Sequence, residues 1–302
     1  MSKNPSQFKN AVAVFYVNIQ ELFSQQSIPK IMKITSIKAK SIITKSNIPG
    51  IDFVANPYVG CQHGCIYCYA EFMKRLTNHA RDIWGEFLDV KQFELDKIGP
   101  EKYDGTTLLL SSVTDPYTPL EVKYENTRRI LKRLIGTKAD IQVLTKSKLV
   151  ERDVDLFEQF ERIEIGVSLN TLNDELAGII EPRASKPADR LKALKKIADK
   201  GIKTYVFVSP IFPRISDWKM VIDTASRITD DFRFENLNFR GHNTPRIMKL
   251  IDSKYPALSE YYRCIRKDHS LWDELAESIE TECKDAGLKC RIEFHHGGFS
   301  KN

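Results

Sequence analysis

Short runs of β-branched and aliphatic residues recur along the chain, and longer stretches with a helical spacing of apolar residues separate them. The runs that predict strands are residues 51–59, 106–112, 140–145, 162–169, 203–209 and 232–239. Residues 125–136 and 186–201 carry apolar side chains three and four positions apart, and each stretch ends in a glycine, which is typical of a helix terminus. Strands that alternate with helices indicate parallel β–α–β units. Six such strands predict an α/β fold, a partial (β/α)6 barrel.

The two ends of the chain follow different patterns. Residues 1–31 are polar and loosely patterned, and a strand pattern begins at Met32. We therefore expect residues 1–31 to be an N-terminal extension that is disordered or outside the native core, and residues 32–243 to form the core barrel. After residue 244 the pattern is mostly helical, with one strand-like run at 289–294. This predicts a helical C-terminal extension over residues 244–302 that covers the barrel.

Composition narrows the class of protein only slightly. The chain of 302 residues is 42% hydrophobic and 28% charged, as in an ordinary globular protein. No apolar run approaches the ~20 residues that a membrane span needs, so we expect no membrane association and a cytoplasmic protein. The net charge of +6 is scattered among acidic residues and only weakly favours an anionic partner.

Polar segments follow the predicted strands. These segments are residues 60–69, 111–119, 145–148, 168–174, 209–214 and 240–243. In parallel barrels the carboxyl ends of the strands meet at one rim, and the chemistry collects there. We therefore expect the functional site at this rim.

The first of these segments carries three cysteines, Cys61, Cys65 and Cys68, in the spacing C-x3-C-x2-C. Thiolates at such a spacing ligate zinc or an iron–sulfur cluster. A closed zinc site needs a fourth protein ligand, for which His63 is a candidate, although four ligands within eight consecutive residues would strain the loop. A [4Fe–4S] cluster held by three thiolates leaves one iron open to another ligand.

Three further cysteines lie far down the chain without a tight mutual spacing: Cys264, Cys283 and Cys290. A disulfide framework is typical of short secreted chains, which this chain does not resemble in length or pattern. We interpret these three as reduced, ordinary cysteines.

The cysteine spacing, with Tyr67 before the last cysteine and a predicted strand before the loop, resembles the radical S-adenosylmethionine superfamily. The order of CIYCY, SSVTDPYTP, LTKSKL, GVSLN, IEPRASKPADRLKAL and VFVSPIFP resembles its spore photoproduct lyase-like branch over roughly residues 35–240. The resemblance implies a [4Fe–4S] cluster on Cys61, Cys65 and Cys68 with S-adenosylmethionine as its fourth ligand. It further implies reductive cleavage of that cofactor to a 5′-deoxyadenosyl radical, and a reducing partner such as flavodoxin or ferredoxin.

The resemblance also assigns roles to residues of the rim. The backbone of Tyr67 would meet the adenine, Thr114 the methionine part, Lys146 the carboxylate, Ser168 and Asn170 the carboxylate or ribose, and Pro210 and Ile211 the adenine pocket. On the substrate side the catalytic candidates are Tyr69 and Asp115, and further rim candidates are Tyr117, Arg183, Arg240, His242 and Asn243.

One position departs from the family pattern. Ser112 stands where photoproduct lyases carry a cysteine that donates a hydrogen atom to the product radical. An O–H bond is far stronger than an S–H bond, which predicts a relative with another substrate. Three classes of function stay open: a radical enzyme acting on a nucleic acid or nucleotide, a radical enzyme that modifies a peptide or small metabolite, and a non-enzymatic iron–sulfur or zinc binding protein.

Overall fold

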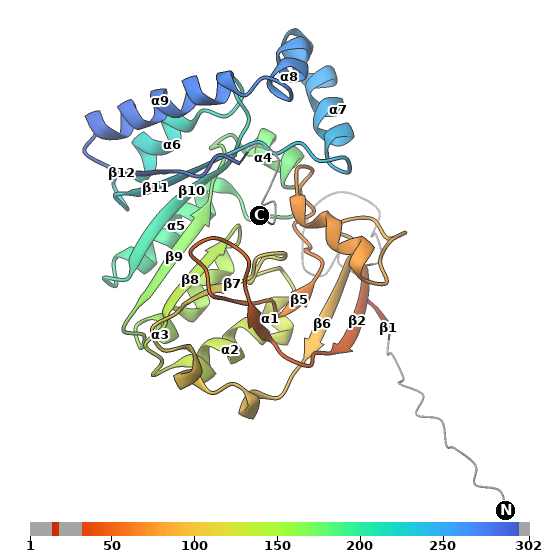
Figure 1. Cartoon of the computed structure of the whole chain (residues 1–302), viewed down its shortest axis with the longest axis vertical. Helices are drawn as coiled ribbons and strands as arrows, with labels where there is room; N and C mark the ends of the chain where they lie inside the picture. Colours follow the sequence, from red (N-terminus) through yellow and green to blue (C-terminus); the bar gives the residue numbers. More distant parts are fainter. Residues whose placement is uncertain (1–13, 18–31, 296–302) are drawn as a thin grey trace, which may run out of the picture.

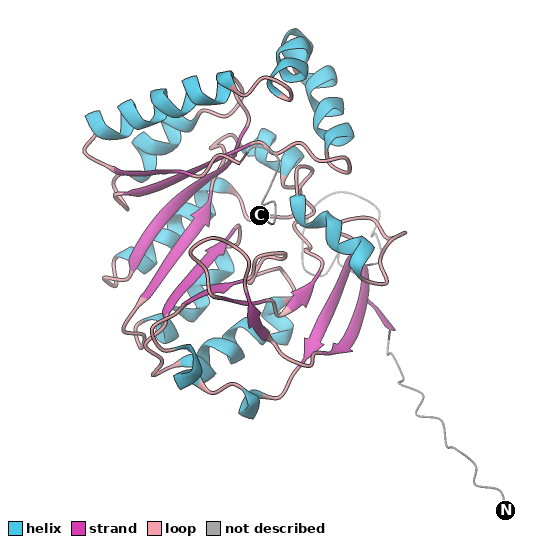
Figure 2. Cartoon of the chain, viewed as in Figure 1, coloured by secondary structure: helices cyan, strands magenta, loops and turns pink. Residues whose placement is uncertain are grey.

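A large, mostly parallel sheet organises the protein, whose computed structural model describes residues 14–17 and 32–295 (Figures 1 and 2). Its strand order is β12-β11-β10-β9-β8-β7-β4-β3. The strands are β3 (Ile43–Lys45), β4 (Phe53–Ala55), β7 (Thr107–Leu110), β8 (Asp140–Thr145), β9 (Ile163–Ser168), β10 (Lys203–Ile211), β11 (Asp231–Asn236) and β12 (Lys289–Ile292). From β4 to β12 neighbouring strands run parallel, whereas β3 is antiparallel to β4. The predicted α/β class with six parallel strands is confirmed, and β12 adds a seventh.

Helices connect the parallel strands and bury their outer face. The longer ones are α2 (Asn126–Leu134), α5 (Pro187–Ala198), α6 (Trp218–Ala225) and α9 (Ser270–Asp285). Ile130, Leu131 and Leu134 of α2 are completely buried in one cluster with Leu108 and Ile141 of the sheet, as their spacing predicted. Burial of each such side chain contributes about 1.5–3 kcal/mol, so this seam anchors the strands that carry the rim loops.

The remaining helices form the loops and the C-terminal part. They are α1 (Glu121–Tyr124), α3 (Val154–Phe157), α4 (Asp174–Ile180), α7 (Thr244–Lys254), α8 (Ser259–Ile265), and the 3-10 helices η2 (Tyr69–Leu76), η3 (Leu95–Lys97), η4 (Pro100–Tyr103), η5 (Lys148–Asp153) and η6 (Pro256–Leu258). Ile247 and Ile251 of α7 and Tyr262 of α8 share a buried cluster with Cys65 and Tyr67. The C-terminal helices, at the top of Figure 1, thus pack directly on the cysteine loop.

The predicted strand over residues 51–59 is divided in the structure. Its first part is β4 in the large sheet, and its second part is β5 (Tyr58–Val59) in a smaller sheet of order β1-β2-β6-β5. Pro57 lies at the break and has no N–H to donate to a neighbouring strand. The chain therefore enters the cysteine loop from the smaller sheet, which also contains β2 (Met32–Lys38) and the unpredicted β6 (Phe87–Gln92).

The chain ends join both sheets. Val14–Val17 forms β1, which pairs antiparallel with the start of β2, and the rest of residues 1–31 lies outside the described residues. At the other end β12 extends the large sheet from within the expected helical extension. The domain boundaries at residues 31/32 and 243/244 stay predictions. In the part of the chain that the structure describes, no helix is long and apolar enough to cross a membrane.

Candidate active site at the carboxyl ends of the strands

Side chains from distant segments hold the carbonyl groups of the cysteine loop. Arg183 Nε donates to the carbonyl of residue 62, and Arg246 Nε donates to that of residue 66 at 3.2 Å. Asn243 Nδ2 donates to the Tyr67 carbonyl at 2.8 Å, and His242 Nε2 lies 3.2 Å from the Cys68 carbonyl oxygen. Four of the loop's backbone acceptors are therefore satisfied by side chains, which fixes the loop without regular secondary structure.

Glycines give the loop its shape. Gly60 and Gly64 have φ angles of 85° and 63°, in the left-handed region that glycine adopts without strain. A Cβ at Gly60 would lie 2.7 Å from the Phe87 ring, and one at Gly64 would meet the Arg183 guanidinium. The loop therefore packs against β6 and Arg183 at distances that only glycine allows.

The three thiols of the loop are free and lie close enough to influence one another electrostatically. Burial raises the pKa of Cys61 to about 12 and that of Cys68 to about 11, and it raises the pKa of Cys65 well above its ordinary value. Thiols with these pKa values are protonated at neutral pH. Metal binding here must displace their protons, because thiolate is the ligand form.

The arrangement of His63 does not fit a four-ligand zinc site. Its Nδ1 lies 3.2 Å from the Arg183 carbonyl oxygen, and its Nε2 lies 3.2 Å from Asp115 Oδ2. Within residues 14–17 and 32–295, no three His, Cys, Asp or Glu side chains are gathered around one point that could hold a single metal ion. A [4Fe–4S] cluster takes its thiolates on separate irons, so the donor set of three free thiols fits that group.

Glu181 is the centre of a buried polar network beside the thiols. It accepts hydrogen bonds from the Tyr67 hydroxyl, from Arg190 Nη2 and, at 3.3 Å, from Asn170 Nδ2. Burial alone would raise the pKa of Glu181, but the charges of Arg190 and Lys146 hold it below its ordinary value. Arg190 also donates to the Ser168 carbonyl at 2.9 Å, which ties the network to the end of β9.

Two polar groups in this network lack partners. Lys146 is half-buried with Nζ 5.8 Å from the centre of the Tyr67 ring, and no acid among the described residues forms an ion pair with it. Burial opposes its charge, but Glu181 and Cys65 raise the pKa of Lys146 above its ordinary value. Asn170 Oδ1 is buried and accepts no hydrogen bond within the described part of the chain. Such unsatisfied groups in a folded protein indicate a ligand site.

The other residues assigned to cofactor binding make contacts inside the protein. Thr114 Oγ1 donates to the Gly60 carbonyl at 2.5 Å, and Ser168 Oγ donates to the Ser209 carbonyl at 3.1 Å. Pro210 is buried, and Ile211 has no exposed surface because it packs in the hydrophobic core. The structure therefore places these four in the wall of the site, and their cofactor contacts stay predictions.

The two catalytic candidates differ in their surroundings. Asp115 is buried and accepts hydrogen bonds from the Tyr117 N–H at 2.8 Å, the Thr145 hydroxyl at 2.6 Å and the Lys146 N–H at 2.8 Å. Against the effect of burial, these contacts and His63 lower the pKa of Asp115 to about 2. A carboxylate held in this way stays ionised at neutral pH and positions the loop of Lys146, and the catalytic role of Asp115 stays a prediction.

Tyr69, the second candidate, opens η2 and is 46% exposed. Its hydroxyl donates to the Ser112 carbonyl, so it joins the cysteine loop to the loop after β7. Glu235, which sequence reasoning missed, is the penultimate residue of β11, lies within electrostatic reach of Tyr69 and accepts a hydrogen bond from Ser209 Oγ. Burial raises the pKa of Glu235 above its ordinary value. The signal that could have found it is an acidic residue next to the carboxyl end of a predicted strand, where the rim loops begin.

The remaining rim candidates have structural contacts. Tyr117 is completely buried and donates to Asp153 Oδ2 at 3.0 Å, whereas Arg183, His242 and Asn243 bind the cysteine loop. Arg240 lines a separate hollow. The three distal cysteines lie elsewhere: Cys264 is exposed on α8, and Cys283 on α9 packs beside Cys290 of β12.

Comparison with protein families and curated proteins identifies relatives. The Radical SAM superfamily matches residues 55–225, more than half of the chain. The chain is 37% identical over 259 residues to the uncharacterized protein MJ0683 of Methanocaldococcus jannaschii, covering 85% of this chain and 96% of that one. It is 32% identical to the uncharacterized protein ORF301 of Acidianus two-tailed virus, covering 65% and 70%. It is 28% identical to the radical SAM Nalpha-GlyT isomerase of Pseudomonas phage M6, covering 68% and 42%.

Solved structures share the fold. The spore photoproduct lyase complexed with dinucleoside spore photoproduct superposes with a TM-score of 0.63 at 18% identity, covering 87% of this chain and 82% of that one. Streptococcus suis SuiB bound to S-adenosylmethionine gives 0.51 at 15% identity, covering 80% and 49%. Family match, sequence relatives and fold agree with the cysteine loop: the chain belongs to the radical S-adenosylmethionine superfamily, has a spore photoproduct lyase-like fold and is an enzyme.

Proposed function

We propose that this enzyme binds a [4Fe–4S] cluster through Cys61, Cys65 and Cys68, binds S-adenosylmethionine beside it, and acts on a nucleic acid or nucleotide. The observation that carries the proposal is that three free thiols lie beside the Lys146 ammonium and Asn170 Oδ1, neither of which has a hydrogen-bond or ion-pair partner in the described part of the chain. When bound, the cluster supplies one electron for cleavage of the cofactor to methionine and a 5′-deoxyadenosyl radical, which takes a hydrogen atom from the substrate.

Lys146 and Asn170 bind the cofactor in this proposal. The ammonium of Lys146 donates to the cofactor carboxylate, a charged hydrogen bond that contributes about 1.5–3 kcal/mol. Asn170 Oδ1 accepts from the cofactor's amino group or a ribose hydroxyl. Glu181 orients the Asn170 side chain by accepting a hydrogen bond from Asn170 Nδ2, and its negative charge stabilises the protonated form of Lys146. Both groups are therefore positioned before the cofactor binds.

Tyr69, Ser112 and Glu235 lie on the substrate side of the proposed site. The half-buried hydroxyl of Ser112 accepts a long hydrogen bond from Asn56 Nδ2, at 3.4 Å. Serine does not give up a hydrogen atom readily, so the substrate radical is resolved without a donor at this position. The solved lyase complex holds a dinucleoside, which supports nucleotides as the substrate class for this chain too.

The test is anaerobic. The chain is reconstituted with iron and sulfide, reduced with dithionite or with a flavodoxin or ferredoxin, mixed with S-adenosylmethionine, and assayed for 5′-deoxyadenosine with and without single-stranded DNA and RNA. We expect product from the wild type and none from Cys65→Ala, because one thiolate ligand is lost. Cys264→Ala, which removes an exposed thiol outside the site, is the matched control and keeps full activity. Uptake of zinc in place of the cluster, or an intact cluster that yields no product under any of these conditions, contradicts the proposal.

A further inference from the structure

A hollow of about 550 Å³ lies beside the cysteine loop, and it is the one that Arg240 lines. It is lined by the segment from Phe239 to Met248, which joins β11 to α7, and by Arg266 at the end of α8. Its volume is within the ~300–1,000 Å³ of small-molecule sites. We call it the 239–266 groove.

The 239–266 groove shares a loop with the proposed radical site. Phe239, Arg240 and Gly241 line the groove, and the next two residues bind the cysteine loop. His242 Nε2 lies 3.2 Å from the Cys68 carbonyl oxygen, and Asn243 Nδ2 donates to the Tyr67 carbonyl at 2.8 Å. A molecule seated at the radical site therefore has the groove as its immediate neighbour.

The lining combines a cation with an aromatic ring. The Arg266 guanidinium lies 5.7 Å from the centre of the Phe239 ring, and Arg266 is exposed and pairs with no acid among the described residues. Thr244 and Met248 lie on the same wall, so the groove offers both polar and apolar contact. Arginine with an aromatic ring is the pair that binds a phosphate and stacks on a base.

The surrounding segment concentrates the positive charge of the protein. Residues 240–269 contain seven Lys and Arg against three Asp and Glu, a net charge of +4 in thirty residues of a chain whose total is +6. Arg246 and Arg263 are neutralised by ion pairs with Glu71 and Asp252. Lys249, Arg266 and Lys267 form no ion pair with any acid that the structure describes, which leaves this face attractive to an anionic chain.

We propose that the 239–266 groove binds a nucleotide that flanks the reacting one on a single-stranded nucleic acid. Arg266 and Arg240 bind its phosphate, and Phe239 and Met248 pack against its base. We take a single strand as the occupant because the cysteine loop is buried, and a single strand presents its bases without the cost of unstacking and flipping one out of a duplex. This inference rests on the proposed function, and it adds a binding site for the part of the substrate next to the reacting nucleotide.

The experiment measures fluorescence anisotropy of a labelled, mixed-sequence DNA strand of about ten nucleotides, a length within known single-strand site sizes. The reconstituted full chain is titrated at several salt concentrations. Arg266→Gln should weaken binding about five- to tenfold at low salt and reduce the salt slope by about one, because one phosphate contact is lost. Arg240→Gln is the second variant, with the same expectation, and thermal melting confirms that each variant is folded.

Arg263→Gln is the matched control, since Arg263 lies on the same helix and pairs with Asp252. It should bind the strand within twofold of the wild type. If the wild type binds with a steep salt dependence and both variants bind equally well, the proposed role of the 239–266 groove is wrong. That result would still agree with a nucleic-acid substrate. A wild type that does not bind the strand at all overturns both.

Discussion

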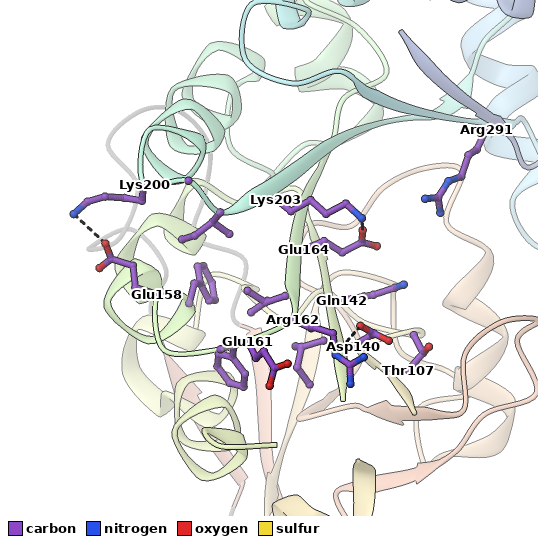
Figure 3. Close-up of a pocket in the computed structure, with 16 residues that line it drawn as sticks. Thr107, Asp140, Gln142, Glu158, Glu161, Arg162, Glu164, Lys200, Lys203 and Arg291 are labelled. Atoms are coloured by element: carbon purple, nitrogen blue, oxygen red, sulfur yellow. Dashed lines mark ion pairs between the residues drawn. The ribbon is translucent and has the colours of Figure 1, made fainter. Parts of the chain in front are cut away.

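Two buried charge networks lie at opposite ends of the large sheet, and they differ in completeness. At the amino ends of the strands, Arg233 donates to both oxygens of Glu164 at 3.0 and 2.9 Å and to Asp231 at 3.0 and 3.2 Å. Its guanidinium also lies 3.6 Å from the centre of the Tyr205 ring. The adjacent hollow, about 820 Å³, is bordered by further ion pairs such as Lys200 with Glu158 (Figure 3).

At the carboxyl ends, the network around Glu181 has a similar composition but is incomplete. Among the described residues it leaves the Lys146 ammonium and Asn170 Oδ1 without a hydrogen-bond or ion-pair partner. The hollow of about 820 Å³ thus lies beside the complete network, and the candidate site lies beside the incomplete one. The candidate site was therefore located by its unsatisfied polar groups and its thiols, and not by the volume of a hollow.

The sharpest way to test this contrast is to break the complete network. Arg233→Met leaves Glu164 and Asp231 buried without their shared partner, which should lower the free energy of unfolding by about 3–5 kcal/mol. The folded fraction should form 5′-deoxyadenosine as fast as the wild type. Urea denaturation and the anaerobic assay measure the two effects. Lys203→Met removes only the exposed partner of Glu164 and should cost less than about 1 kcal/mol. A catalytic defect in folded Arg233→Met would place function at both ends.

The matching change in the incomplete network is Lys146→Met. Its ammonium has no hydrogen bond or ion pair among the described residues and interacts with Glu181 only at longer range, so thermal stability should change little. Affinity for S-adenosylmethionine should fall about ten- to a hundredfold, since a charged hydrogen bond contributes about 1.5–3 kcal/mol. Equilibrium dialysis with the reconstituted protein measures this. Lys148→Met, on the same loop and exposed beside Asp189, should change neither quantity. Unchanged affinity with lowered stability would make Lys146 a structural residue.

The smallest effect concerns pH. The pKa of Asp115 is about 2 in the folded protein and 3.8 ordinarily, so its ionised form favours folding. That contribution, about 2 kcal/mol, is present above pH 4 and is lost as the pH falls towards 2. Asp115→Asn cannot ionise, and its melting temperature should fall less steeply than that of the wild type between pH 4 and pH 2. If the melting temperatures of the two proteins fall equally between pH 4 and pH 2, the charge of Asp115 contributes nothing to stability.

Local patterns were enough to predict the six central parallel strands of the large sheet, the helices α2 and α5, and the three cysteines. Each of these depends on residues that are close in sequence, such as the apolar positions of α2 or the glycines around Cys61. The partners of Glu181 could not be predicted in this way, because Tyr67 and Arg190 meet only when β5 and α5 are brought together. For the same reason the contact between Arg183 and the cysteine loop could not be predicted from the sequence, and its role on the substrate side stays a prediction.

The long reach of the bonds that hold the cysteine loop also has a consequence during synthesis. The donors to its carbonyl groups are synthesised later than the loop. Arg183, Asn243 and Arg246 follow the residues whose carbonyls they bind by 121, 176 and 180 positions. At about 5–20 residues per second, the ribosome delivers the last of them on the order of ten seconds or more after the thiols emerge. During that interval the nascent chain carries three unprotected thiols. The loop acquires its full set of side-chain hydrogen bonds only after residue 246 has emerged, so the three thiols are exposed to oxidation until then.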